Sequence, residues 1–319
     1  MRTNLSSLLC FAVSFGVTIL TAQTREQRPR KVFYAPKPLK PASYRAPMKP
    51  LVRLADLKAK HGGQANWSEL VVDDKNNRAD VISAAPGSKV ARHLHSDAPE
   101  YWVVQQGRIR FEIEDPPGKF QTIDAGKGAL VFAAERHLHS LEVIGSEPAI
   151  RFQVALADTT PVFETKPAVA EKGMEYVPVT LSTGVNPDDV PNPEGKPDRL
   201  FFNAAEMWKE HEGRRSWSDL AIRKNRAHAN IICGHGADTK RDPGNRGHYH
   251  ADFDEIWTVL QGQQRWSIEG LDPFVAGEGD VVYAPANRWH LVEAYGEGPS
   301  CRLAITPYPA GNHLYDPLQ

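Results

Sequence analysis

The sequence predicts an all-β protein built from two tandem jelly-roll barrels. The first observation is an internal repeat, in which Trp67-Ser-Glu-Leu70 recurs as Trp217-Ser-Asp-Leu220. The second is that both copies consist of short apolar or alternating runs separated by Gly, Pro and Asp clusters, a pattern typical of strands and turns. The third is a Pro-rich break between the copies. A repeat of this length indicates one duplicated structural module.

Composition shifts divide the 319 residues into five segments. Arg2 and the apolar run Leu8–Leu20 are typical of a secretory signal peptide, and the run is short for a membrane span. An uncleaved anchor is the alternative; after cleavage we expect no stable membrane insertion and an exported protein, periplasmic or extracellular. The predicted segments are a signal peptide (1–22), a Pro-rich basic arm (23–50), barrel 1 (51–157), a Pro-rich linker (158–197) and barrel 2 (198–319).

Within the barrels, only two short stretches look helical, one before each copy. They are Leu51–His61 and Ala204–Glu212. Strands are expected at Arg108–Glu112 and Ala129–Ala133, with counterparts in the second copy. Cys233 and Cys301 both lie in apolar, strand-like runs, so the sequence leaves open a disulfide between them or two buried thiols.

Charge composition narrows the classes of partner. The chain has 38 basic and 39 acidic residues, a net charge of −1. Nucleic-acid binding needs a concentrated basic surface, so no nucleic-acid partner is expected. The sequence also lacks a Gly-x-Ser-x-Gly elbow, a phosphate-binding Gly-rich loop and an HExxH helix. A small-molecule substrate is the expected partner, and a homo-oligomer is left open.

Histidines and a glutamate recur at matched spacing in both copies. The first copy has His93-Leu-His95 followed by Glu100 and Gly107, with His139 eleven residues after Gly128. The second copy has the equivalent set His248, His250, Glu255 and His290. Side chains two apart on a strand share a face, so each His-x-His pair points to one side. Three imidazoles and one carboxylate suit divalent Fe, Mn, Cu, Ni or Zn, and we expect one such ion per barrel.

Both repeats resemble the cupin family, and the pair resembles a bicupin. The similarity rests on the two motifs, Gly87–Glu142 and His248–Glu293. It implies two double-stranded β-helix barrels, with the two sets of residues above as metal ligands. In the first motif, Ala134-Glu-Arg136 replaces the usual Pro-x-Gly, so His137 could compete with His139 as the ligand.

Three functions are consistent with that resemblance, and the sequence favours the first. A dioxygenase would use open metal positions near the aromatic residues Tyr101, Trp102, Tyr249, Trp257, Tyr283 and Trp289. A manganese decarboxylase resembling oxalate decarboxylase would hold an anionic substrate with Arg92, Arg136, Lys240, Arg241, Arg246 or Arg288. A non-catalytic ligand-binding or storage cupin is the third, although both ligand sets are intact. His137 and Glu135 are candidate proton carriers, but no catalytic residue is assigned.

Overall fold

The fold is that of a computed structural model, which describes residues 33–34, 37, 40–165, 199–224, 226–236, 245–309 and 313–316. The predicted signal peptide, much of the basic arm and most of the linker lie outside these residues. Among the described residues, neither helix is long and apolar enough to cross a membrane.

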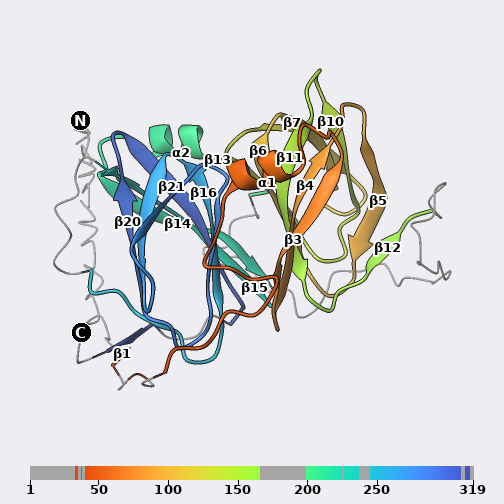
Figure 1. Ribbon diagram of the computed structural model, residues 1–319. Helices are drawn as coiled ribbons and strands as arrows, with labels where there is room; N and C mark the ends of the chain where they lie inside the picture. Colours follow the sequence, from red (N-terminus) through yellow and green to blue (C-terminus); the bar gives the residue numbers. More distant parts are fainter. Residues whose placement is uncertain are drawn as a thin grey trace, which may run out of the picture. The chain divides into compact units, whose positions relative to one another are not determined.

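The first barrel is formed by two sheets, as the alternating runs predict (Figure 1). Its six-stranded sheet has the order β13-β9-β6-β11-β4-β3 and its five-stranded sheet the order β12-β5-β10-β7-β8. The strands are β3 (Trp67–Asp73), β4 (Asn77–Ala84), β5 (Lys89–His95), β6 (Glu100–Gln106), β7 (Arg108–Glu114), β8 (Phe120–Gly126), β9 (Ala129–Ala133), β10 (His139–Ile144), β11 (Ala149–Leu156), β12 (Pro161–Phe163) and β13 (Phe201–Asn203).

The second barrel repeats this plan with a six-stranded sheet, β14-β15-β21-β16-β19-β2, and a three-stranded sheet, β18-β17-β20. Its strands are β2 (Leu51–Val52), β14 (Ser216–Lys224), β15 (Ala227–His235), β16 (Glu255–Gln261), β17 (Gln263–Ile268), β18 (Phe274–Gly277), β19 (Val281–Ala284), β20 (His290–Tyr295) and β21 (Pro299–Thr306). A further parallel pair joins β1 (Phe33–Tyr34) to β22 (Leu314–Tyr315). The all-β prediction is confirmed.

The leading strand of each barrel pairs with the other barrel. β2 lies beside β19 with Val52 opposite Val281, and β13 lies beside β9 with Phe202 opposite Leu130. Each added strand satisfies backbone groups that would otherwise stay unpaired at a sheet edge. The segments predicted as 51–157 and 198–319 therefore exchange their first strands. β12 also lies inside the predicted linker and pairs with β5.

The two predicted helices are present and short. They are α1 (Leu54–Lys60) and α2 (Ala204–Glu210). The expected start of the first at Leu51 is wrong, because Leu51–Val52 is strand β2. Asn203 caps α2 by accepting hydrogen bonds from the backbone N–H groups of Ala205 and Glu206, which would otherwise lack partners.

Glycine closes the same turn in both barrels. Gly107 and Gly262 have φ values of 73° and 66°, a region that disfavours other residues. A Cβ on Gly107 would lie 2.8 Å from the Cα of Ala149, and one on Gly262 would lie 2.4 Å from the carbonyl oxygen of Pro299. The turn after each glutamate-bearing strand thus requires glycine, because its φ is positive and because a Cβ would clash with the neighbouring backbone.

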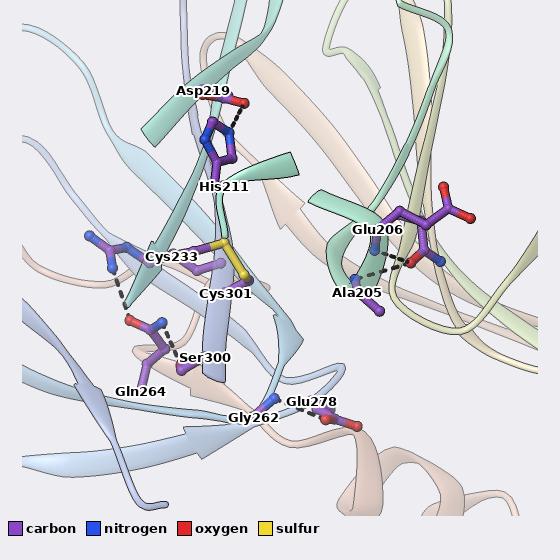
Figure 2. The surroundings of a disulfide bond; sticks show 12 residues. Ala205, Glu206, His211, Asp219, Cys233, Gly262, Gln264, Glu278, Ser300 and Cys301 are labelled. Carbon is purple, nitrogen blue, oxygen red and sulfur yellow. Dashed lines mark hydrogen bonds and ion pairs between the residues drawn. A yellow bond between two sulfur atoms is a disulfide. The ribbon is translucent and has the colours of Figure 1, made fainter. Parts of the chain in front are cut away.

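Cys233 and Cys301 form a disulfide across neighbouring strands (Figure 2). They are directly opposite each other in the pairing of β15 with β21, and both are buried. Of the two alternatives left open by the sequence, the disulfide is the one present. It joins residues 68 positions apart, so it restricts a long loop of the unfolded chain.

Removing this disulfide is expected to lower the free energy of unfolding by about 2–4 kcal/mol. The measurement is urea denaturation of the Cys233→Ala/Cys301→Ala double variant against the oxidised wild type. Wild type unfolded and refolded with reductant is the matched control, because it keeps both buried sulfur atoms. An unchanged denaturation midpoint in both samples would contradict the expectation.

Candidate metal centres

In the first barrel, four predicted ligands meet at one point of the interior. His93 and His95 lie at the end of β5, Glu100 begins β6 and His139 begins β10. β10 pairs antiparallel with β5, which puts His139 directly opposite His93. All four side chains are buried. Their ligand atoms lie within 4.8 Å of one another.

Backbone carbonyl groups fix the direction of the imidazoles. Nδ1 of His93 lies 2.8 Å from the carbonyl oxygen of Ala91, and Nδ1 of His139 lies 2.9 Å from that of His137. A carbonyl oxygen only accepts, so each Nδ1 must donate, which leaves Nε2 as the nitrogen that donates to Glu100 or, once deprotonated, binds a metal. Those Nε2 atoms lie 3.3 Å and 2.9 Å from Oε2 of Glu100. The potential ligand atoms of His93, His139 and Glu100 therefore converge on one point.

The second barrel assembles the equivalent group. His248 forms an isolated antiparallel bridge with His290, and Nδ1 of His290 lies 3.0 Å from the carbonyl oxygen of Arg288. Oε2 of Glu255 lies 2.8 Å from Nε2 of His250, 3.2 Å from that of His290 and 4.0 Å from that of His248. The four ligand atoms again lie within 4.8 Å of one another.

Both carboxylates are held in the charged form that a metal requires. Burial alone would raise the pKa of Glu100, but hydrogen bonds from His139, His93 and His95 hold it well below its usual value. Glu255 shows the same balance: burial raises its pKa, and hydrogen bonds with His250 and His290 bring the pKa well below the ordinary range. Each barrel thus holds a three-histidine, one-glutamate group that suits a divalent metal.

The two groups differ in what covers their carboxylates. In the first barrel, Nε2 of Gln153 donates to Oε1 of Glu100 at 2.6 Å, and Nε of Arg151 donates to Oε1 of Gln153 at 2.9 Å. Gln153 lies opposite Asp80 in the pairing of β11 with β4. A side-chain amide therefore occupies the space beside this glutamate.

In the second barrel, the same place is open. Ala304 lies opposite Asn230 in the pairing of β21 with β15, as Gln153 lies opposite Asp80. Its methyl group can neither bond to Glu255 nor fill the volume of a glutamine. A cavity of about 270 Å³ opens here, and its walls include the four ligands and Ala304. Other lining residues include Ser218, His228, Asn230, Phe253, Trp257, Leu291, Arg302, Thr306 and His313.

Arg302 gives this cavity a positive charge. It lies on β21, opposite Ile232 of β15. Arg151 has the equivalent position in the first barrel, on β11 and opposite Ile82 of β4. Burial lowers the pKa of Arg302 to about 10, and the charge of Glu255 partly offsets that effect. The guanidinium remains protonated at neutral pH. Its NH1 donates to Oε1 of Gln264 at 2.9 Å, and Gln264 in turn donates to Ser300 (Figure 2).

Several candidates from the sequence lie elsewhere. His137 does not replace His139: its Nδ1 lies 2.5 Å from the carbonyl oxygen of Glu114, and its own carbonyl group orients His139. Glu135 is buried outside the four-residue group. Five of the six aromatic candidates (Tyr101, Trp102, Tyr249, Trp257 and Tyr283) are buried, and only Trp257 is among the cavity-lining residues.

Two of the cations proposed for an anionic substrate, Arg92 and Arg288, bind other groups of the protein. Arg92 pairs with Glu112 and Glu164, and Arg288 donates to the carbonyl groups of Glu269 and Ala42. Arg136 and Arg246 do not line the cavity, and Lys240 and Arg241 lie outside the described residues.

Sequence reasoning missed Arg302, although a signal existed. An arginine interrupts the same apolar strand in both copies, in Ala149-Ile-Arg-Phe152 and in Ser300-Cys-Arg-Leu303. His228, Asn230 and His313 were missed as well, because only the three-dimensional pairing directs them to the cavity.

Comparison with known proteins agrees with this architecture. Residues 240–306 match the family model for the cupin domain. A cupin 2 conserved barrel domain protein from Leptotrichia buccalis is similar in fold, with 17% identity, a TM-score of 0.52 and coverage of 86% of this chain and 100% of that one. Oxalate decarboxylase of Bacillus subtilis, whose Mn(II) centres have been studied, gives 18% identity and a TM-score of 0.48 over 78% of this chain and 74% of that one. No curated protein matches. The match to the cupin domain thus covers part of the second barrel, and each of the two barrels holds one complete ligand group.

Proposed function

We propose that this protein is a two-barrel cupin that acts as an exported, manganese-dependent decarboxylase of a small carboxylate, with its reaction site in the second barrel. The observation that carries the proposal is Arg302, a cation in the wall of the same cavity as a three-histidine, one-glutamate group. Arginine holds carboxylates through paired, charge-assisted hydrogen bonds. A carboxylate substrate would thus meet the guanidinium and the metal group in one cavity.

The charged groups around Arg302 in the second barrel favour binding of an anion more than those around Arg151 in the first barrel do. In the first barrel, the charge of Arg151 interacts with Glu100 and also with Asp80. The position of Asp80 is taken by the neutral Asn230 in the second barrel, so Glu255 is the carboxylate that interacts with Arg302. A bound divalent cation would compensate Glu255, and the cavity would then attract an anion.

The decarboxylase alternative fits these features better than the dioxygenase interpretation favoured by the sequence. That interpretation rested on open metal positions, on the family resemblance and on aromatic residues near the ligands, and five of those six aromatic residues are buried. A cavity of about 270 Å³ is at the small end of ligand sites, which suits a short acid more than a polycyclic aromatic molecule.

In the proposed reaction, the bond between a carboxylate and its neighbouring carbon breaks, carbon dioxide leaves, and the electron pair on the remaining carbon takes a proton. Arg302 would hold the carboxylate, while Phe253, Trp257 and Leu291 would limit access of water. The divalent metal, when bound, would supply a Lewis acid for the substrate oxygens.

In this proposal, His228 would carry the proton. Its Nδ1 lies 3.0 Å from Oγ1 of Thr306, and the imidazole lines the cavity. Burial and the nearby Arg223 lower the pKa of His228, although Glu255 acts in the opposite direction. The imidazole is therefore mainly neutral at pH 7 and can exchange a proton.

The direct test is release of carbon dioxide from small mono- and dicarboxylates by the manganese-loaded protein, beginning with oxalate and measuring formate in parallel. Equal amounts of the two products are expected from oxalate. Stoichiometric oxygen uptake without carbon dioxide release would instead support a dioxygenase. Binding of carboxylates without any turnover would support the ligand-binding alternative.

An Ala304→Gln variant tests where the reaction takes place. The new amide would occupy the position that Gln153 holds in the first barrel and fill the cavity beside Glu255. Turnover should fall by roughly tenfold or more because the substrate is displaced, while the metal content stays at the wild-type level. Gln153→Ala is the matched control and should keep its turnover. The opposite pattern would place the reaction in the first barrel.

A further inference from the structure

The segment that follows each barrel lies beside the strand or loop that carries the His-x-His pair. In the first barrel, β12 pairs antiparallel with β5, and Val162 lies opposite Leu94, the residue between His93 and His95. In the second barrel, Leu314 forms an antiparallel bridge with Tyr249, the residue between His248 and His250. Both backbone hydrogen bonds of this bridge measure 3.0 Å.

This shared geometry makes the two segments structural counterparts. The triplet 313–315 occupies the place in the second barrel that 161–163 occupies in the first. The last residue of each is aromatic and lies near the first ligand: the ring centroids are 5.2 Å apart for Phe163 and His93, and 6.4 Å apart for Tyr315 and His248. The duplication therefore extends past the barrels themselves.

The first residue of each triplet is different in chemistry. Pro161 has no side-chain donor or acceptor, whereas its counterpart His313 carries an imidazole. The ring of His313 lies 4.3 Å from that of His248 and 4.9 Å from that of His250. His313 is exposed to solvent and also lines the cavity, so it lies at the cavity mouth.

We propose that His313 is a substrate-binding residue that makes the second site selective for dicarboxylates. This inference rests on the proposed function, in which Arg302 holds one carboxylate. The imidazole of His313 supplies a second polar group to the same cavity, and its N–H donates to the other carboxylate. A monocarboxylate lacks that second group and gains little from His313.

The experiment compares anion binding to manganese-loaded wild type, His313→Ala and His313→Gln by isothermal titration calorimetry, with oxalate as the dicarboxylate and acetate as the monocarboxylate. A hydrogen bond to a charged group contributes enough that His313→Ala should weaken oxalate binding by about tenfold to a hundredfold. Acetate binding should change by less than about twofold. Glutamine keeps an N–H donor and should restore most of the oxalate affinity.

Pro161→Ala is the matched control, since it alters the equivalent position of the first barrel, and it should bind both anions as wild type does. Metal content and melting temperature are measured for each variant. Unchanged oxalate affinity in His313→Ala overturns the inference, as does loss of one metal equivalent, which would make His313 a metal ligand. If Arg302→Ala weakens binding and His313→Ala does not, only the role of His313 fails. If wild type binds neither anion, the proposed function fails with it.

Discussion

Replacing Arg302 with alanine is expected to lower kcat/KM for a small carboxylate by on the order of a hundredfold to a thousandfold, with the metal content unchanged. Arg302 lines the cavity of the second barrel but is not one of the four ligands. Removing one partner of a buried, hydrogen-bonded charge pair costs about 2–5 kcal/mol. In the proposed reaction, the partner that remains is the substrate carboxylate, so the loss appears in turnover.

Two further variants separate charge, geometry and location. Arg302→Lys keeps a positive charge but loses the planar guanidinium, so its kcat/KM should lie between those of alanine and arginine. Arg151→Ala removes the equivalent guanidinium from the first barrel, where Arg151 donates to Gln153. Its kcat/KM should remain within about twofold of wild type. Full activity in Arg302→Ala would exclude the proposed substrate-binding role of this residue.

The ligand groups could be predicted from sequence because their geometry is mostly local. Alternation along a strand places His93 and His95 on one face, and a short turn brings Glu100 to the neighbouring strand. The repeat then supported the same assignment for the second copy. The distal His139 was assigned by its spacing and by resemblance, and the pairing of β10 with β5 puts it opposite His93.

Long-range pairing explains what the sequence did not predict. β2 and β13 have two and three residues, and no local pattern indicates that each pairs with the other barrel. The disulfide depends on the register that puts Cys233 opposite Cys301, which no spacing rule supplies. Likewise, only the strand pairing shows that Gln153 and Ala304 have equivalent positions. Gln153 lies on β11 opposite β4, and Ala304 lies on β21 opposite β15, so one site is covered by an amide and the other is open.

The preference for a dioxygenase shows how position changes the meaning of a residue type. Aromatic residues next to metal ligands in the sequence suggested a site for an aromatic substrate. Trp102 and Tyr101 instead have 1% and 2% of their surface exposed and belong to the hydrophobic core. Arg302, nine residues beyond the end of the motif at Glu293, contributes to the cavity wall. Closeness to the ligands in the sequence was therefore a weaker indicator of cavity-lining residues than the direction in which side chains of β21 point.

Removing one ligand from each barrel in turn should separate the roles of the two metal groups. His93→Ala and His248→Ala are each expected to lose one of two metal equivalents, because one of three imidazoles is gone from the affected group. A metal that binds only the folded state stabilises it by about 4 kcal/mol at a thousandfold excess over its Kd. Each variant should therefore lose an increment of this size in the free energy of unfolding.

Turnover should separate the two variants. His248→Ala alters the group that shares a cavity with Arg302, so it should abolish carbon dioxide release. His93→Ala alters the group whose glutamate is covered by Gln153, so it should retain most of the activity of wild type at a temperature where both are folded. Elemental analysis, urea denaturation with and without chelator, and product measurement on the same samples provide the test.

Loss of turnover in His93→Ala with activity kept in His248→Ala would assign the reaction to the first barrel. Less than one metal equivalent in wild type, unchanged by either substitution, would mean that neither group holds a metal and would favour the ligand-binding alternative.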